Sequence, residues 1–561
     1  MFKKYIFILS SLCLLLSCSV VDSEHPFYAV EDAADLNEPV FYHQPSGLYL
    51  KHQNDPFSLA NMQTAYDKVV ATKGDGGFFH QGGKLSPTHF ALKMYPRTLK
   101  EWSAIDNMDD IKVSYYPFDY TPVPGEVVNE DDSNSPFEKS KYSETCTYKA
   151  VGDDTEKEET VSLPILYVVW PADKELPQEY DYVVDYGVFI PSYAMSTKAE
   201  SGLSLSEKRT LEREALVLAL GEKILLGTKS FDDPDDSANF KVLRGSVSCF
   251  DSTYFGLLPL PNLGMKFELG TFIYDTCSND LGTFDITIDT QYHPYLNFSF
   301  YFRTSKFEVR IANSSSYYQI SLGTVASVFG PDLYGYQDFD LSYLSTQALH
   351  AFRAANYYYR GSHEITKYYS GTRIVIKAFN QSGPGPGIVG QFCYTSNSCY
   401  IEIYKCDTGT SSIYIGAILH ELGHYLHYGL VGYSNFDSTQ LLVAESFSSF
   451  VGWSLGHKYY QQYNHYLTSG LNDGTGQGWQ KWTGPSDEYS PLFVDLQDTF
   501  NQGNYGIGYV YDTISGVPYS AIETIITTCT SWASVRQALA ALVGTYYSQS
   551  DFDSFVLLYG N

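Results

Sequence analysis

The chain has 561 residues, too many for a single hydrophobic core, and this length predicts three or more domains. Hydrophobic residues make up 44% and charged residues 18%, which excludes a largely disordered protein. The formal net charge of −28 argues against nucleic acid and anionic lipid headgroups as partners.

The N-terminus has the pattern of an export signal. Lys3 and Lys4 form a basic start, and residues 5–16 form an apolar stretch that is short for a membrane-spanning helix. The stretch ends in Ser17-Cys18, which resembles a bacterial lipobox. An ordinary secretory signal with an incidental cysteine is the alternative.

The lipobox resemblance implies that Cys18 becomes the lipidated N-terminus and that residues 1–17 are a lipoprotein signal peptide. We therefore expect a protein of the cell envelope whose N-terminal lipid anchors it to the outer membrane. We also expect it to be exposed at the cell surface. Residues 18–55 are acidic and lack a periodic pattern, so we interpret them as a tether.

Residues 56–235 are predicted to form an N-terminal α/β region. Strand-like apolar runs alternate with segments that carry leucine and alanine at helical spacing. The predicted strands are residues 88–95, 111–116, 165–170 and 182–190, and the predicted helices are residues 98–105 and 206–226. Residues 124–160 are rich in Asp, Glu, Ser and Gly, so we predict a loop there.

Residues 236–315 are predicted to form a small antiparallel β-sandwich. Short alternating runs such as MKFELGTFIY and LNFSFYFR are separated by turn residues. The stretch RGSVSCFDSTYFGLLPLPNLGMKFELGTFIYDTCSNDLGTFDITI resembles a carboxypeptidase-regulatory or transthyretin-like domain. This resemblance implies a structural or adhesion module without chemistry of its own. The 50 tyrosines of the chain favour β-rich structure, and a carbohydrate-binding surface is the alternative.

Nine cysteines occur, and seven remain after the two of the signal region, an odd number that leaves at least one without an intrachain partner. Cys393 and Cys399 flank a short turn and could close a hairpin disulfide in an oxidising compartment. Cys249 and Cys277 are a second candidate pair. The alternative for each cysteine is a small buried apolar side chain. No CxxC pair occurs, so a zinc site built from cysteine is not expected.

Residues 330–561 are predicted to form a mostly helical C-terminal domain, which makes the whole chain a multidomain α+β protein. The predicted helices are residues 346–358, 411–430, 438–460, 491–500, 519–526 and 531–546, and the predicted strands are residues 373–379 and 401–405. Residues 468–489 are rich in glycine and are predicted as a long loop.

The helix predicted for residues 411–430 contains the motif His420-Glu421-Leu422-Gly423-His424 within an apolar segment. Four residues turn a helix by about 400°, so both imidazoles leave the same face and can bind one zinc ion. Glu421 is offset by about 100°, beside the metal, where it can take a proton from a metal-bound water. A pair of stacked surface histidines is the alternative, and the apolar flanks argue against it.

A catalytic zinc ion needs a third protein ligand. The metzincin pattern HExxHxxGxxH fails, because His427 and Leu430 stand where that pattern has glycine and its third histidine. Glu445 is the single charged residue of LLVAESFSSF, and a metal ion would remove the free-energy cost of burying its carboxylate. A charge at a helix N-terminus or a hydrogen-bonded core glutamate is the alternative.

The combination of His420, Glu421, His424 and Glu445 resembles the gluzincin family of zinc peptidases. The resemblance implies a Zn²⁺ cofactor held by the two histidines and Glu445, with Glu421 as general base. Many gluzincins carry aspartate four residues after the glutamate ligand, whereas this chain has Ser449, which leaves the partner of the histidine open. The segments THFALKMYPRTLKEW, HAFRAANYYYRG and SPLFVDLQDTFNQ resemble uncharacterised Bacteroidetes lipoproteins with a gluzincin-like core.

Peptide hydrolysis also needs a donor to the tetrahedral oxyanion, usually a downstream histidine or tyrosine. The candidates are Tyr489, Tyr505, Tyr509, His457 and His465. We select Tyr489 as the second catalytic residue because it ends the glycine-rich loop directly before a predicted helix.

The sequence therefore predicts a zinc-dependent endopeptidase, lipid-anchored in the cell envelope, that acts on a protein or glycoprotein substrate. One alternative is a peptidase directed at glycoproteins such as mucins. The other is a non-catalytic binding or adhesion lipoprotein that retains a zinc site. Glu421 argues against the last interpretation, because a structural zinc ion needs no general base.

Overall fold

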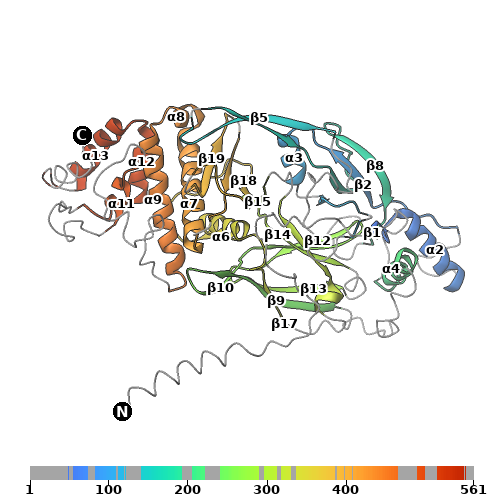
Figure 1. Ribbon diagram of the computed structural model, residues 1–561. Helices are drawn as coiled ribbons and strands as arrows, with labels where there is room; N and C mark the ends of the chain where they lie inside the picture. Colours follow the sequence, from blue (N-terminus) through green and yellow to red (C-terminus); the bar gives the residue numbers. More distant parts are fainter. Residues whose placement is uncertain are drawn as a thin grey trace, which may run out of the picture. The chain divides into compact units, whose positions relative to one another are not determined.

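The structure is a computed structural model that describes residues 48–49, 55–73, 82–108, 111–118, 120–121, 141–153, 155–191, 205–220, 240–289, 296–312, 317–329, 336–385, 388–396, 398–406, 409–464, 489–498, 514–546, 548 and 550. This part of the chain mixes eleven helices with several sheets, so the coarse prediction of a mixed helix and strand chain is confirmed (Figure 1). No described helix is long and apolar enough to cross a membrane. The predicted signal peptide and Cys18 lie outside the described residues.

The strands and helices predicted for the N-terminal region are present, with small shifts of their ends. Four strands form a sheet of order β3-β7-β2-β8 in which every pairing is antiparallel. Strand β7 is buried along its whole length, which explains its continuous apolar run. The elements are α2 (Leu59–Lys73), β2 (His89–Tyr95), α3 (Leu99–Asp106), β3 (Lys112–Ser114), β7 (Leu166–Pro171), β8 (Asp181–Val188) and α4 (Leu205–Leu220), with a separate pair of β1 (Leu48–Tyr49) and β4 (Tyr120–Thr121).

Part of the segment predicted as a loop, residues 124–160, forms strands instead. β5 (Ser143–Ala150) and β6 (Lys157–Ser162) pair antiparallel, with Thr145 opposite Thr160. The loop prediction is wrong here because the side chains of β5 alternate between exposed and half-buried positions. A strand that faces solvent in this way accepts the charged residues that suggested a loop.

Residues 240–340 contain two four-stranded sheets. One has the order β10-β9-β13 with β17 added in parallel to β9, and the other has the order β12-β11-β14-β16. The rings of Phe298 and Phe300 in β14 lie 5.8 and 5.2 Å from the ring of Phe339 in β17, so the two sheets share one apolar core. The elements are β9 (Phe240–Asp251), β10 (Gly256–Pro259), β11 (Gly264–Leu269), β12 (Phe272–Cys277), β13 (Thr283–Asp289), β14 (Asn297–Tyr301), β16 (Gln319–Thr324), α5 (Val325–Phe329) and β17 (Tyr336–Asp340).

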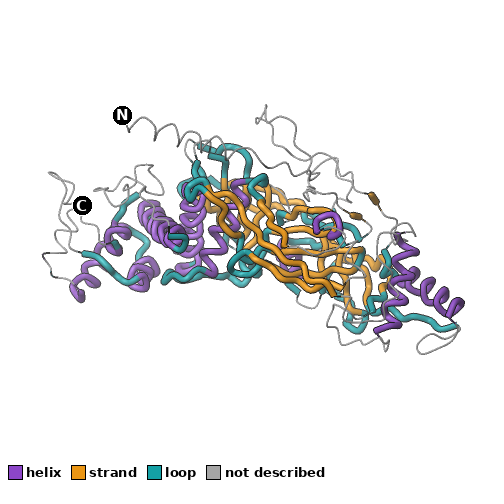
Figure 2. The backbone as a smooth tube through the Cα atoms, turned by 90° about the horizontal axis from the view of Figure 1, so that it is seen from below, coloured by secondary structure: helices purple, strands orange, loops and turns teal. Residues whose placement is uncertain are grey.

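A six-stranded sheet of order β15-β18-β20-β19-β5-β6 supports the helix that carries the HExxH motif. Its strands are among those drawn in orange in Figure 2. β15, β18 and β20 run parallel, and β19, β5 and β6 continue the sheet antiparallel. The sheet thus takes strands from each of the three predicted regions. Its remaining elements are β15 (Phe307–Ile311), β18 (Ile374–Ala378), β19 (Gly390–Tyr394) and β20 (Cys399–Ile403).

The C-terminal helices agree with the predictions to within a few residues. Helix α6 packs on β15 and β18, and α7 packs on β19, on β20 and on α9. A short helix, α8, precedes α9, and the sequence pattern does not predict it. The helices are α6 (Thr346–Arg360), α7 (Ser411–Val431), α8 (Tyr433–Asp437), α9 (Leu441–Gln461), α11 (Leu492–Gln497), α12 (Tyr519–Thr528) and α13 (Trp532–Tyr546).

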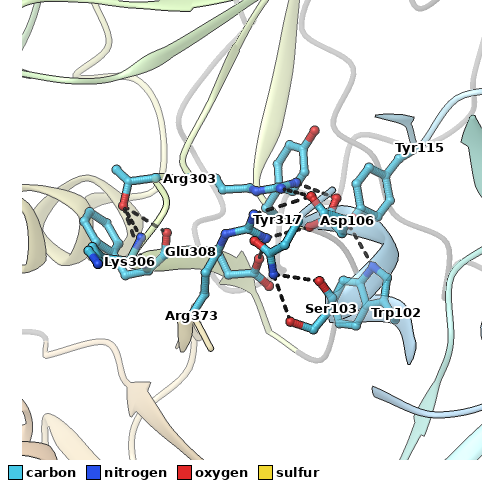
Figure 3. A network of polar contacts seen from close by, with 12 residues as sticks. Trp102, Ser103, Asp106, Tyr115, Arg303, Lys306, Glu308, Tyr317 and Arg373 are labelled. Atoms are coloured by element: carbon cyan, nitrogen blue, oxygen red, sulfur yellow. Dashed lines mark hydrogen bonds and ion pairs between the residues drawn. The ribbon is translucent and has the colours of Figure 1, made fainter. Parts of the chain in front are cut away.

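A buried cluster of charged side chains joins α3 to the six-stranded sheet (Figure 3). Asp106, at the end of α3, accepts hydrogen bonds from Arg303 Nη1 at 2.7 Å and from Arg373 Nη1 at 2.6 Å. Glu308 of β15 accepts a further bond from Arg310 Nε at 2.7 Å. Burial raises the pKa of the Asp106 carboxyl group, but the two arginines outweigh burial and lower this pKa below its ordinary value. These ionised groups therefore hold helix α3 against the six-stranded sheet.

The predicted disulfides are not formed. Cys393 and Cys399 are free thiols, and the β19–β20 ladder explains why. Cys393 lies opposite Tyr400, the residue after Cys399, so the two cysteine side chains leave opposite faces of the sheet. Cys249 and Cys277 are also free, and their strands belong to different sheets.

Candidate metal centre

The two helices that carry the predicted ligands, α7 and α9, pack closely against each other. Small residues allow this approach. A Cβ atom on Gly423 would lie 2.8 Å from Ser448 Cα, and one on Gly452 would lie 3.2 Å from His420 Cβ. Because a larger side chain at either position would separate the helices, these glycines bring Glu445 of α9 to the histidine face of α7.

The side chains of His420, His424 and Glu445 converge, as the sequence predicts. His420 Nε2 lies 3.1 Å from His424 Nε2 and 3.0 Å from Glu445 Oε2. His424 Nε2 lies 3.4 Å from Glu445 Oε1. Within the described residues, this is the group of His, Cys, Asp and Glu side chains whose ligand atoms lie close enough to hold a metal ion, all within 4.8 Å of one another.

These separations fit a small tetrahedral cation. Ligand bonds of about 2.0–2.1 Å at tetrahedral angles separate neighbouring ligand atoms by about 3.3–3.4 Å. The closest observed separations are 3.0, 3.1 and 3.4 Å, measured to Glu445 Oε2 for His420 and to Oε1 for His424, so they equal that value or lie slightly below it. Two imidazole nitrogens that face each other at 3.1 Å need a proton or a cation between their lone pairs. The group can therefore hold a metal ion.

The three side chains influence one another's protonation. Burial opposes ionisation of Glu445, but His424 and His420 outweigh burial and hold the pKa of this carboxyl group well below its ordinary value. Burial lowers the pKa of His424. Burial also acts to lower the pKa of His420, but the hydrogen bond to Glu445 and the charges of Glu421 and Glu445 together outweigh burial, so this pKa is raised. An ionised carboxylate beside a neutral imidazole is a donor set that suits a divalent cation.

Glu421 lies beside the ligands and against strand β19. Burial raises the pKa of its carboxyl group to about 8, and Glu445 adds to the rise, whereas His420 and a hydrogen bond from the Phe392 backbone amide oppose it. A Cβ atom on Gly390 would lie 2.8 Å from Glu421 Cγ and 2.8 Å from its Oε1. Gly390 thus leaves the space that this carboxylate occupies. No sequence pattern points to Gly390 or Phe392, because their contact with Glu421 depends on the pairing of distant strands.

Other side chains hold the histidine rings from behind. Ser449 Oγ lies 3.3 Å from His420 Nδ1. Ser449, which replaces the aspartate of many gluzincins, is therefore the partner of this histidine. The ring of Phe392 stacks on that of His424 at 6.1 Å and 18°. His427 is fully buried, and its ring nitrogens have no hydrogen-bond partner among the residues that the structure describes. Burial, with a smaller contribution from His424, lowers the pKa of His427 to about 3, so it stays neutral and acts as an apolar packing residue.

The candidate oxyanion donors differ in where the structure places them. Tyr489 is half-buried against the core, and the amide of the next residue, Ser490, donates to Ser446 Oγ at 2.8 Å. Because Ser446 adjoins Glu445, Tyr489 belongs to a segment that contacts the ligand helix. His457 Nδ1 instead lies 2.8 Å from the Trp453 carbonyl oxygen of its own helix. The remaining candidates, Tyr505, Tyr509 and His465, lie outside the described residues.

The chain matches no protein-family model, and a search of curated proteins finds no significant match.

Proposed function

We propose that the chain is a zinc-dependent endopeptidase in which His420, His424 and Glu445 bind the metal ion and Glu421 is the general base. The convergence of the two imidazole Nε2 atoms and the Glu445 carboxylate group, with closest separations of 3.0 to 3.4 Å and with Glu421 beside them, supports this proposal most strongly. Two imidazoles and one carboxylate are typical of catalytic zinc sites, which keep a fourth position open for water or substrate. Structural zinc sites usually have four protein ligands instead.

A zinc ion in this site would activate a water molecule and polarise the scissile carbonyl group. Glu421 accepts the proton of the attacking water and passes it to the leaving amine. Tyr489 remains our candidate for the donor to the oxyanion, since Ser490 beside it bonds to the neighbour of Glu445.

The edge of β19 beside Glu421 is suited to an extended peptide. β5 pairs with β19 only at Cys393 and Tyr394, so no described strand pairs with Gly390 on that side. Gly390 directly adjoins the Glu421 carboxylate. A substrate that adds to this edge as a strand would bring its backbone next to the general base.

The export signal and Cys18 support a location in the cell envelope, where a lipid anchor holds the enzyme near protein or glycoprotein substrates. The resemblance to gluzincins and to Bacteroidetes lipoproteins, with residues 330–561 as a gluzincin-like domain, belongs to the same proposal.

The test compares cleavage of casein by the zinc-loaded wild type and by a Glu421→Gln variant with equal zinc content. We expect the substitution to lower the cleavage rate by about 100- to 10,000-fold, because it removes the general base and keeps the ligands. Glu402→Gln is the matched control, since Glu402 is also a buried glutamate but bonds to Tyr404 Oη. Bound zinc without cleavage of casein or of a glycoprotein such as mucin by the wild type would favour a binding lipoprotein instead.

A further inference from the structure

The hairpin that connects β9 and β10 exposes a cluster of large apolar side chains. Phe250 is 47% exposed, Leu257 51% and Phe255, at the tip, 85%. Phe250 and Leu257 stand directly opposite each other in the β9–β10 ladder, so they share the outer face. Tyr254, also at the tip, is 38% exposed. We call these four residues the hairpin patch. An exposed apolar cluster of this kind is typical of an interaction surface.

The backbone at the tip is strained as well. Phe255 has φ 58°, in the left-handed region that glycine and asparagine adopt readily and bulky residues avoid. Burial of the Phe255 side chain does not offset the free-energy cost of this strain, because the side chain projects into solvent. Neither the conformation nor the exposure of Phe255 stabilises the fold, so both indicate that this residue has a role in binding.

The base of the hairpin is fixed to the start of α7. The Ser252 amide donates to Ser411 Oγ at 2.8 Å, and the Ser411 amide donates back to Ser252 Oγ at 2.9 Å. The Ser412 amide donates to Thr253 Oγ1 at 2.9 Å. The hairpin therefore supplies the N-terminal cap of α7, whose own cap residue, Thr410, makes no side-chain capping bond.

The hairpin is also fixed to α6 and to the end of α9. Asp251 is fully buried and pairs with Arg353 of α6 at 3.0 Å, and it accepts a bond from Tyr460 Oη of α9 at 3.2 Å. The rings of Tyr254 and Tyr463 lie 6.1 Å apart. Figure 1 shows β10 beside the end of α9. The patch is thus held at a fixed position relative to both helices that carry the proposed ligands.

We propose that the hairpin patch is a docking surface for apolar side chains of a polypeptide substrate that is bound at the metal centre, an inference that rests on the proposed function. His420 is the ninth residue after Ser411 in α7, a rise of about 14 Å along the helix axis. An extended peptide covers this distance with about four or five residues. A substrate longer than this can contact the patch and the metal centre together.

The surroundings of the patch favour a polypeptide over a membrane surface. Asp338 and Asp340 are exposed on β17, the strand next to β9. Their carboxylates repel anionic headgroups, as does the net charge of −28. Apolar segments of unfolded or extended proteins carry no such penalty.

The test uses Phe255→Gly and Phe255→Asn in the full mature chain, two substitutions that relieve the backbone strain. We expect an equal or higher melting temperature, unchanged zinc content, and a KM for reduced, carboxymethylated casein that rises about 5- to 10-fold with unchanged kcat. Cleavage of a blocked tripeptide from a casein cleavage site, which is too short to contact both places, keeps its kcat/KM. Tyr336→Ser is the matched control, because Tyr336 is 57% exposed on the same sheet at the register of Arg244, six residues from Phe250.

Binding of fluorescein-labelled casein to the Glu421→Gln chain separates this inference from the proposed function. A higher Kd for casein when Phe255→Gly is added to this chain supports the docking surface. If the wild type cuts no casein, that result refutes the proposed peptidase activity and leaves the docking surface in place. An unchanged Kd or an unchanged KM overturns the docking surface. Loss of binding to phosphatidylcholine vesicles in the Phe255 variants, with casein binding intact, also overturns it and assigns the patch to a membrane.

Discussion

Ser449 Oγ lies 3.3 Å from His420 Nδ1, on the side of the imidazole ring away from the ligand cluster. The opposite nitrogen, His420 Nε2, faces Glu445 at 3.0 Å. When Nε2 binds a cation, Nδ1 carries the proton and donates to Ser449, which fixes the tautomer and the orientation of the ring.

Ser449→Ala should therefore weaken zinc binding by about 10-fold, because partners behind a metal-binding histidine contribute 10- to 100-fold to affinity. Titration against a fluorescent zinc chelator measures this change. Ser448→Ala is the control, since Ser448 is equally buried on the same helix and its hydroxyl has no hydrogen-bond partner. Equal affinities of the two variants would mean that Ser449 does not orient His420.

Gly390→Ala should abolish most of the peptidase activity and leave zinc bound. The added Cβ would lie 2.8 Å from two atoms of Glu421, so the carboxylate must move, and a displacement of about 1 Å can lower a rate by about 100-fold. The zinc content and the casein cleavage rate are measured together. Activity close to that of the wild type would show that Glu421 does not act from this position. Gln391→Ala, at the next residue of β19, is the control and should keep full activity.

The ligands could be predicted from the sequence because each depends on local pattern. The HExxH spacing fixes the relation of His420 to His424 within one helix, and the lone charge of LLVAESFSSF singles out Glu445. Gly390 could not be found in this way. Its importance comes from β19, which pairs with β20 nearby and with β5 more than 200 residues earlier in the chain, and local pattern carries no information on such pairings.

The elements of the fold divide in the same manner. Strand β7 and helix α7 are apolar enough to be recognised alone. Hairpin β5–β6 is polar and faces solvent, so its composition is that of a loop. The cap of α7 by Ser252 and Thr253 also went unrecognised, because a cap supplied from another part of the chain leaves no mark in the sequence beside the helix.

Asp106→Asn should strongly destabilise the protein. The change leaves Arg303 and Arg373 buried without their carboxylate, and breaking a buried ion pair costs about 3–5 kcal/mol. Urea unfolding followed by tryptophan fluorescence measures the loss. Asp285→Asn is the control, because the pair of Asp285 with Arg244 is exposed and such pairs contribute less than about 1 kcal/mol. Similar losses for both variants would contradict a stabilising role for the cluster in Figure 3.

Asp55 gives the stability a defined dependence on pH. Burial raises the pKa of this carboxyl group from 3.8 to about 6, although Oδ1 accepts the Phe57 amide and Oδ2 accepts Tyr186 Oη, each at 2.9 Å. Because the pKa in the folded state is raised, the associated stability is fully present below pH 3.8 and is lost as the pH rises through about 6.

Asp55→Asn should remove this loss. The difference in unfolding free energy between the variant and the wild type should shift in favour of the variant by about 2 kcal/mol between pH 4 and pH 7, since one pKa unit corresponds to about 1.4 kcal/mol and part of the loss already occurs below pH 4. Parallel urea titrations at both pH values measure the difference. A constant difference across this range would show that Asp55 titrates normally in the folded chain.

The zinc content of the purified chain after dialysis tests the metal centre most directly, with the wild type, Glu421→Gln and Glu445→Ala measured side by side. The wild type and Glu421→Gln should each retain about one zinc ion per chain, and Glu445→Ala should retain almost none, because it lacks one of the three ligands. A wild type without zinc, or a Glu445→Ala variant that retains as much zinc as the wild type, would contradict a metal centre formed by His420, His424 and Glu445.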